Sequence, residues 1–173
     1  EIANIDGVDL VLGNNKKFEL DKYLIDIKKN KTTKIVRQEI EEFNQFKNSF
    51  SFGTRTRSFL KIQDGCNYKC TFCTIPLARG KSRSSTIENI IQQINKLKAS
   101  NVKEIVLTGV NIGDFKTKTH ERLIDLLSAI DKLSGIRVRI SSIEPNLIND
   151  QIIQLVSKSK ILVPHFHIPL QSG

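Results

Sequence analysis

The chain has 173 residues, 39% of them apolar, which suits one domain or one domain with part of another. It contains no apolar run of about 18 residues and no signal-peptide pattern, which argues against a membrane protein and makes the cytoplasm the expected location. Its 27 basic and 18 acidic residues give a net charge of +9, which favours an anionic partner, most commonly nucleic acid.

The first 33 residues predict the end of an α/β domain. Residues 8–12 suit a buried strand, and Leu20, Tyr23, Leu24 and Ile27 then recur at helical spacing. One strand and one helix cannot bury both their faces, so this part needs a partner layer. Because the chain opens with Glu1 and contains no methionine, we expect it to be an internal fragment of a longer protein.

Residues 34–51 predict a polar linker, and residues 52–173 predict a second domain. Phenylalanines along this stretch are expected to pin it to the surface, namely Phe43, Phe46, Phe50 and Phe52. Apolar strands are then expected at residues 59–62, 104–107, 137–140 and 165–168. Helical stripes lie between them at residues 87–97, 123–133 and 148–156. This alternation predicts an α/β fold with a parallel sheet, either a barrel or an open sheet.

Unusual residues follow each of the four expected strands. The cysteines follow the first strand, residues 108–111 the second, residues 141–145 the third and residues 171–173 the fourth. Functional groups of parallel α/β folds gather where strands end, so we expect one site at this rim.

The three cysteines of the chain, Cys66, Cys70 and Cys73, all lie within eight residues. Clustered thiolates suit an iron–sulfur cluster or zinc, and three of them leave one metal position open. A zinc site would take its fourth ligand from His120, His165 or His167. A disulfide would leave one odd cysteine, and inert or redox-active thiols are a further alternative.

The other strand ends carry groups suited to a nucleotide-like cofactor. Gly109 allows backbone amides to approach a ligand, with an ordinary turn as the alternative. Carboxylate and hydroxyl groups suit ribose hydroxyls, although helix capping would also explain them. The candidate cofactor contacts are Thr108, Gly109, Asn111, Ser141, Glu144 and Gln171. The basic residues Arg79, Lys81 and Arg83 are candidates for RNA phosphate contact, or form a solvated loop.

The spacing C-x3-C-x2-C, with Phe72 before the last cysteine, resembles the signature of radical S-adenosylmethionine (SAM) enzymes. The runs at residues 57–66, 75–84, 107–113 and 167–173 resemble their methylthiotransferase branch. Residues 141–145 are most similar to members that act on tRNA carrying N6-threonylcarbamoyladenosine 37.

This resemblance implies a partial radical SAM (βα) barrel, truncated after about four strands where the family has six. It implies a [4Fe–4S] cluster on the three cysteines with SAM on the fourth iron, an external electron donor, and a radical that allows a methylthio group to be inserted at C2 of the tRNA adenosine. Family members carry a second [4Fe–4S] cluster in an N-terminal domain and a C-terminal RNA-binding domain. The 173 residues alone are therefore not expected to methylthiolate tRNA.

Three alternatives remain open from the sequence. The first alternative, within the family, is a methylthiotransferase that acts on isopentenyl-adenosine tRNA or on an aspartate of a ribosomal protein. Outside it, the chain is a non-catalytic, zinc-bearing nucleic-acid-binding module. A third is an electron-transfer protein whose cluster does not respond to SAM.

Overall fold

The computed structural model describes residues 1–14, 16–25, 32–37, 45–51 and 56–171. The strands are β1 (Leu10–Leu12), β2 (Lys34–Val36), β3 (Ser49–Phe50), β4 (Arg57–Lys61), β5 (Gln63–Asp64), β6 (Arg83–Ser84), β7 (Glu104–Thr108) and β8 (Arg137–Ile140). The α-helices are α1 (Leu20–Leu24), α2 (Ile75–Arg79), α3 (Ile87–Ala99), α4 (Leu123–Asp131) and α5 (Asp150–Lys158). Short 3-10 turns cover Ile2–Asn4, Lys17–Glu19, Ile112–Asp114 and Pro145–Leu147.

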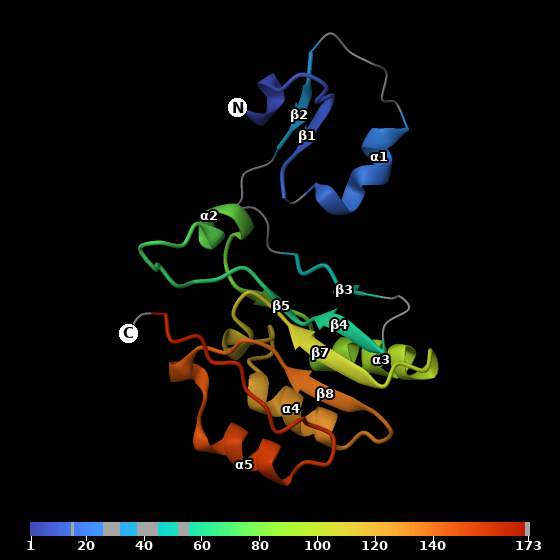
Figure 1. Cartoon of the computed structure of the whole chain (residues 1–173), viewed down its shortest axis with the longest axis vertical. Coiled ribbons are helices and arrows are strands. Elements are labelled where there is room, and N and C mark those ends of the chain that lie inside the picture. The colour runs from blue at the N-terminus through green and yellow to red at the C-terminus, as the bar shows by residue number, and fades with distance from the viewer. Residues whose placement is uncertain (15, 26–31, 38–44, 52–55, 172–173) are drawn as a thin grey trace.

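The main sheet has the strand order β3-β4-β7-β8, and its three long strands are parallel. Arg57 of β4 pairs with Glu104 of β7, which pairs in turn with Arg137 of β8. Parallel neighbours require a crossover, and helices α3 and α4 supply the two crossovers (Figure 1). The predicted α/β fold, with parallel strands alternating with helices, is confirmed.

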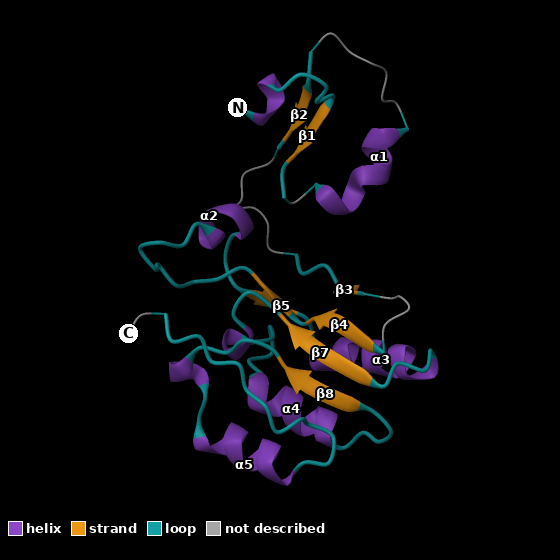
Figure 2. Ribbon diagram, in the orientation of Figure 1, coloured by secondary structure: helices purple, strands orange, loops and turns teal. Residues whose placement is uncertain are grey.

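One hydrophobic core lies between the sheet and a row of three helices, in which α4 contacts both α3 and α5 (Figure 2). Alternate residues of the strands face this core because successive side chains of a strand point to opposite faces. Helix α3 begins where the Thr86 side chain accepts a hydrogen bond from the Asn89 amide, and it buries Ile90, Ile94 and Leu97. Each such side chain contributes roughly 1.5–3 kcal/mol when fully buried.

The opposite face of the sheet is more open and polar. Phe59 on β4 is 44% exposed there. Glu104 on β7 forms ion pairs with Arg57 at 3.2 Å, Arg139 at 3.0 Å and Arg137 at 3.7 Å. These pairs follow from the register, which sets the arginines on the strands beside Glu104. An open inner face is what an incomplete barrel presents to solvent.

The fourth expected strand, at residues 165–168, is not a regular strand. The chain does run parallel to β8 here, but it makes only two isolated bridges, Val138 with Leu162 and Ser142 with His167. Pro164 lies between these bridges and has no N–H to donate, which interrupts a continuous ladder. The fourth parallel segment is therefore present in position, while its hydrogen bonding is broken.

The first residues form a small unit in which β1 and β2 pair in parallel. No described residue of this unit up to Val36 is fully buried, and Leu20 and Leu24 of α1 are 44% and 52% exposed. Exposed apolar side chains of this kind agree with the need for a further layer. Ile27 lies outside the described residues.

The structure differs from the expected linker over residues 34–51 at both ends. Strand β2 joins the first unit, whereas β3 pairs with β4 at the edge of the main sheet. Phe46 lies against Lys61, whose ammonium is 5.1 Å from the ring centroid, as an anchoring aromatic would. Phe43 and Phe52 lie outside the described residues. None of the helices in the described ranges has the length and apolarity needed to span a membrane.

Candidate functional site

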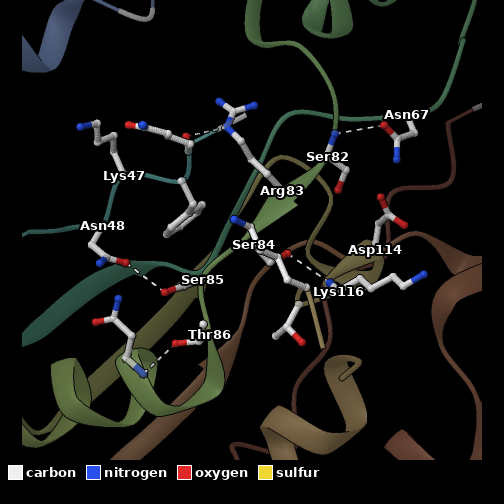
Figure 3. Close-up of a pocket in the computed structure, with 15 residues that line it drawn as sticks. Lys47, Asn48, Asn67, Ser82, Arg83, Ser84, Ser85, Thr86, Asp114 and Lys116 are labelled. Carbon is white, nitrogen blue, oxygen red and sulfur yellow. Dashed lines mark hydrogen bonds between the residues drawn. The ribbon is translucent and has the colours of Figure 1, made fainter. Parts of the chain in front are cut away.

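The cysteines lie on a loop, residues 65–82, that leaves and re-enters the fold through one stem. Strands β5 and β6 pair antiparallel at this stem, with Gln63 opposite Ser84. The Cys66 amide donates to the Gly80 carbonyl at 3.1 Å, and the Ser82 amide donates to Asn67 Oδ1 at 3.1 Å (Figure 3). Short α2 is the loop's only helix in the described chain, and it ends at Gly80.

Gly65 closes this loop at a point where no other residue fits well. Its φ is +72°, and a Cβ built on it would lie 2.1 Å from the Lys81 carbonyl oxygen. The left-handed conformation and the backbone contact both require glycine. The thiol loop is therefore fixed at its base by backbone packing.

All three cysteines are free thiols, with Cys66 and Cys73 partly buried and Cys70 exposed. The Tyr68 amide donates to Cys66 Sγ at 3.4 Å. Within the described residues, no three Cys, His, Asp or Glu side chains are gathered as a ligand set, so neither the cluster nor the zinc alternative has a preformed cage here. Three accessible thiols on one loop are nevertheless the donors that an iron–sulfur cluster requires.

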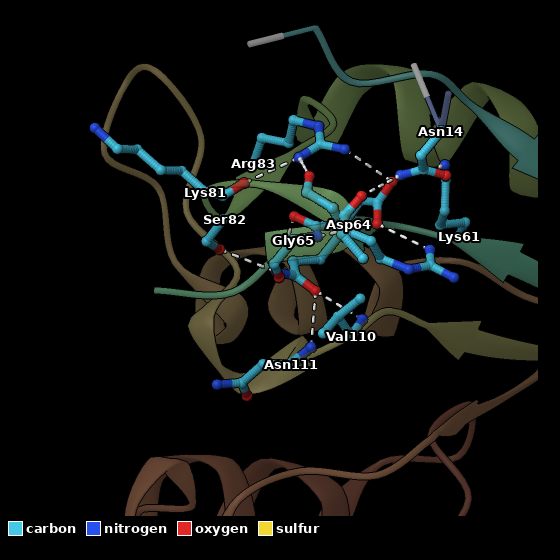
Figure 4. Close-up of polar contacts among 12 residues, drawn as sticks. Asn14, Lys61, Asp64, Gly65, Lys81, Ser82, Arg83, Val110 and Asn111 are labelled. Carbon is cyan, nitrogen blue, oxygen red and sulfur yellow. Dashed lines mark hydrogen bonds and ion pairs between the residues drawn. The ribbon is translucent and has the colours of Figure 1, made fainter. Parts of the chain in front are cut away.

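Asp64, which directly precedes this loop, is buried and holds three cations (Figure 4). Its carboxylate lies 3.1 Å from Arg79 Nη1, 3.1 Å from Arg83 Nη2 and 3.5 Å from Lys61 Nζ. Burial alone would raise the pKa of Asp64, but the Lys61 charge, the Arg79 hydrogen bond and the Arg83 charge together hold it below its usual value. The carboxylate thus anchors both ends of the loop to the sheet.

This arrangement separates the three basic residues considered for RNA contact. The side chains of Arg79 and Arg83 are bonded to Asp64, and that of Arg83 is only 8% exposed. Arg83 also donates to the carbonyls of Arg79 and Lys81, at 2.8 and 3.0 Å. Lys81 itself is exposed. The two arginines therefore have structural partners, whereas Lys81 faces solvent.

Gln63, which is fully buried, joins the cysteine loop to the end of β7. Its Oε1 accepts from the amides of Val110 and Asn111, both at 2.9 Å. Its Nε2 donates to the Gly65 carbonyl at 2.7 Å and lies 3.0 Å from Ser82 Oγ. One side chain thus sets the distance between two strand-end loops that are nearly 50 residues apart.

The predicted residues at the end of β7 and just after it lie in three different settings. A Cβ on Gly109 would be 2.8 Å from Gln63 Oε1, so packing against Gln63 explains the glycine without a ligand. Thr108 is partly buried. Asn111 is 4% exposed, and neither polar atom of its side chain has a partner within the described chain. Because buried amides are normally paired, this side chain calls for a partner from outside the described chain, either an ordered water or a ligand.

The ends of β8 and of the fourth segment meet as the sequence predicted. Gln171 Nε2 donates to Glu144 Oε1 at 2.9 Å, although the residues are 27 apart. Ser142 Oγ lies 2.7 Å from His167 Nδ1. Ser141 is partly buried, and its amide donates to the Leu107 carbonyl at 3.2 Å. Ser172 lies outside the described residues.

A hollow of about 740 Å³ opens beside these loops on the inner face of the sheet. Its lining includes Gln63, Asp64, Arg79, Thr108 and Gly109. A volume of this size suits a small-molecule ligand. The hollow therefore brings together the stem of the cysteine loop and the β7 loop, whereas Asn111, Ser141, Glu144 and Gln171 lie outside its lining.

The sequence interpretation missed Gln63 and Asp64 as site residues. Both are polar, and they sit at the end of an apolar strand directly before the cysteine loop. A buried polar pair at that position was the available signal, since such residues must find partners.

Comparison with known proteins adds three findings. The family profile described as the Radical SAM superfamily matches residues 60–173. The chain is 38% identical over 176 residues to threonylcarbamoyladenosine tRNA methylthiotransferase MtaB of Aquifex aeolicus, covering all of this chain and 43% of that protein. It is 32% identical over 169 residues to tRNA-2-methylthio-N(6)-dimethylallyladenosine synthase of Clostridium botulinum, covering 96% of this chain and 38% of that protein.

Among solved structures, the radical S-adenosylmethionine methyltransferase TsrM of Kitasatospora setae matches 57% of this chain and 18% of its own, with a TM-score of 0.48 and 16% identity. The chain spans about two fifths of the length of the two curated relatives.

Proposed function

Since the chain belongs to the radical SAM superfamily, we propose that it is the central part of a tRNA-modifying methylthiotransferase. In this proposal Cys66, Cys70 and Cys73 hold a [4Fe–4S] cluster, and SAM takes its open iron. When bound, these cofactors supply the radical chemistry that attacks an unactivated carbon. The observation that carries the proposal is the Gln63 side chain, which hydrogen-bonds both the thiol loop and the backbone of the β7 loop. The β7 loop also carries the side-chain amide of Asn111, which has no partner in the described chain.

The chain's own residues have the task of holding the two loops in place. Asp64 and Gln63 fix the stem of the thiol loop, and Gly65 lets its backbone turn sharply. We infer that SAM lies in the hollow lined by Thr108 and Gly109. The side-chain amide of Asn111, which has no partner in the described chain, supports a further contact with SAM. Ser141, Glu144 and Gln171 are proposed as contacts for the ribose or for the substrate.

The proposed substrate is N6-threonylcarbamoyladenosine 37 of tRNA, modified at C2. Its support is the similarity to the Aquifex aeolicus enzyme of that name and the run at residues 141–145. Isopentenyl-adenosine tRNA is the second candidate, supported by the Clostridium botulinum relative. Mass spectrometry of nucleosides from a strain lacking the gene separates them, because only the true substrate loses its methylthio group. Loss from a ribosomal aspartate instead would refute both. A tRNA substrate also implies a cytoplasmic location.

Anaerobic reconstitution of the full-length protein tests the metal centre. We expect about four irons and four sulfides fewer per chain in a Cys66/Cys70/Cys73→Ala variant than in the wild type. The matched control is Thr71→Ala, an exposed change in the same loop, which should keep the full content. One zinc and no colour from these cysteines would favour the non-catalytic module. A cluster whose spectrum ignores SAM would favour electron transfer.

A further inference from the structure

A second hollow, of about 590 Å³, borders the cysteine loop at Asn67 and Ser82 (Figure 3). Residues 45–48, 82–86, 114 and 116–118 form most of its wall. Asn67 of the cysteine loop also lines it and accepts the Ser82 amide. A ligand here would therefore lie beside the thiol loop, while occupying different space from the proposed SAM hollow.

The charge of this hollow is positive. Lys47, Lys116 and Lys118 line it, and none of them forms an ion pair with an acidic residue of the described chain. Asp114 is the one acidic residue among the described residues of the lining, where three ammonium groups outweigh a single carboxylate. Because the three ammonium groups have no acidic partner in the described chain, they remain available to bind an anion.

Hydroxyl groups surround the same space. Ser82, Ser84, Ser85 and Thr86 line the hollow, and Thr86 caps the first turn of α3. The positive end of this 13-residue helix therefore adds to the lysine charge. Ammonium, hydroxyl and helix-end amide groups are the usual partners of phosphate oxygens in nucleic-acid complexes.

We propose that this hollow, lined by Lys47, Lys116 and Lys118, binds a phosphodiester of the RNA substrate and holds the strand beside the thiol loop. The inference rests on the proposed function, because it takes its ligand class from the tRNA substrate. A cavity of nucleotide size with lysines from two separate segments suits a backbone phosphate better than a base edge, since lysine binds phosphate as a point charge.

The test measures tRNA affinity of the full-length protein by fluorescence anisotropy between 50 and 200 mM KCl. The variant is Lys47/Lys116/Lys118→Ala. The matched control is Lys103/Lys158/Lys160→Ala, which removes the same charge around another hollow, at the opposite end of the strands. Loss of one neutralised phosphate should make the log–log salt dependence shallower by roughly 1 and weaken binding about tenfold. The control should keep most of the wild-type salt slope.

Equal salt slopes in the variant and its control would overturn the phosphate site, even if the protein methylthiolates tRNA normally. Iron content and the spectral response to SAM are measured on the same samples. Neither should change, since the three lysines lie outside the hollow proposed for SAM. A wild-type protein that binds no tRNA at any salt concentration would instead overturn the tRNA substrate, and the phosphate site with it.

Discussion

Replacing Gln63 by methionine should loosen the β7 loop more than any other single polar change at the site. Methionine keeps the length of the side chain but removes both its acceptor and its donor. The amides of Val110 and Asn111 then lose the only partner the structure gives them, at 2.9 Å each. The Gly65 carbonyl loses a donor at 2.7 Å.

The magnitude follows from burial. Gln63 and Gly65 are buried and Asn111 is 4% exposed, so the freed Asn111 amide and Gly65 carbonyl do not reach water, whereas Val110 is partly exposed. Each buried group left unsatisfied costs about 1–3 kcal/mol. If opening of the β7 loop becomes easier by about 2–3 kcal/mol, amide exchange there accelerates roughly 30- to 150-fold.

The assay is hydrogen–deuterium exchange of the full-length protein, followed in peptides that cover residues 107–112. The control is Gln92→Met, the same chemical change at an exposed position of α3, where the amide reaches Glu88 only at 3.5 Å. This control should shift stability by no more than about 0.5 kcal/mol. Unchanged exchange of residues 107–112 in the Gln63 variant would refute the bridging role.

Two further predictions concern stability. Gly65→Ala should lower the urea midpoint more than Gly135→Ala does. Both glycines have positive φ, so alanine at either position costs about 1–2 kcal/mol in backbone strain. Only at Gly65 does the new Cβ also meet backbone, 2.1 Å from the Lys81 carbonyl oxygen. For Glu104, burial raises the pKa, but the Arg139 hydrogen bond and neighbouring charges lower it overall, so its stabilisation is present at neutral pH and lost as pH falls below about 4.3. Glu104→Gln should therefore unfold more easily than the wild type at pH 7, with a smaller difference at pH 3.

Equal urea midpoints for the two glycine variants would show that the loop stem yields without cost. A Glu104→Gln difference that is the same at pH 3 and pH 7 would mean that the arginine pairs contribute nothing through charge.

The regular elements were predictable because their signals are local. Apolar spacing predicted α3 and its core side. The fourth strand was not predictable in the same way, since residues 165–168 are compatible with a strand, but Pro164 interrupts its pairing with β8. Local propensity does not report whether a neighbouring strand can supply every hydrogen bond.

The candidate site divides in the same manner. The thiol spacing and the strand-end positions were visible in the sequence, and so was the meeting of the rims that carry Glu144 and Gln171. The sequence did not show that Gly109 packs against Gln63, or that Arg79 and Arg83 form ion pairs with Asp64. These contacts join residues 15 to 46 positions apart, whose distance depends on the sheet register.

The sequence by itself determined the order of strands and helices, the family and the position of the thiol loop, because these depend on spacing between near neighbours. Only the tertiary structure decided which polar side chains are structural and which remain without a partner. Asn111 and Gln63 are both polar residues beside strand ends. The side chain of Asn111 has no partner in the described chain, whereas that of Gln63 makes five hydrogen bonds. That difference arises from the parallel register of β4 and β7, which brings distant loops to one edge of the sheet.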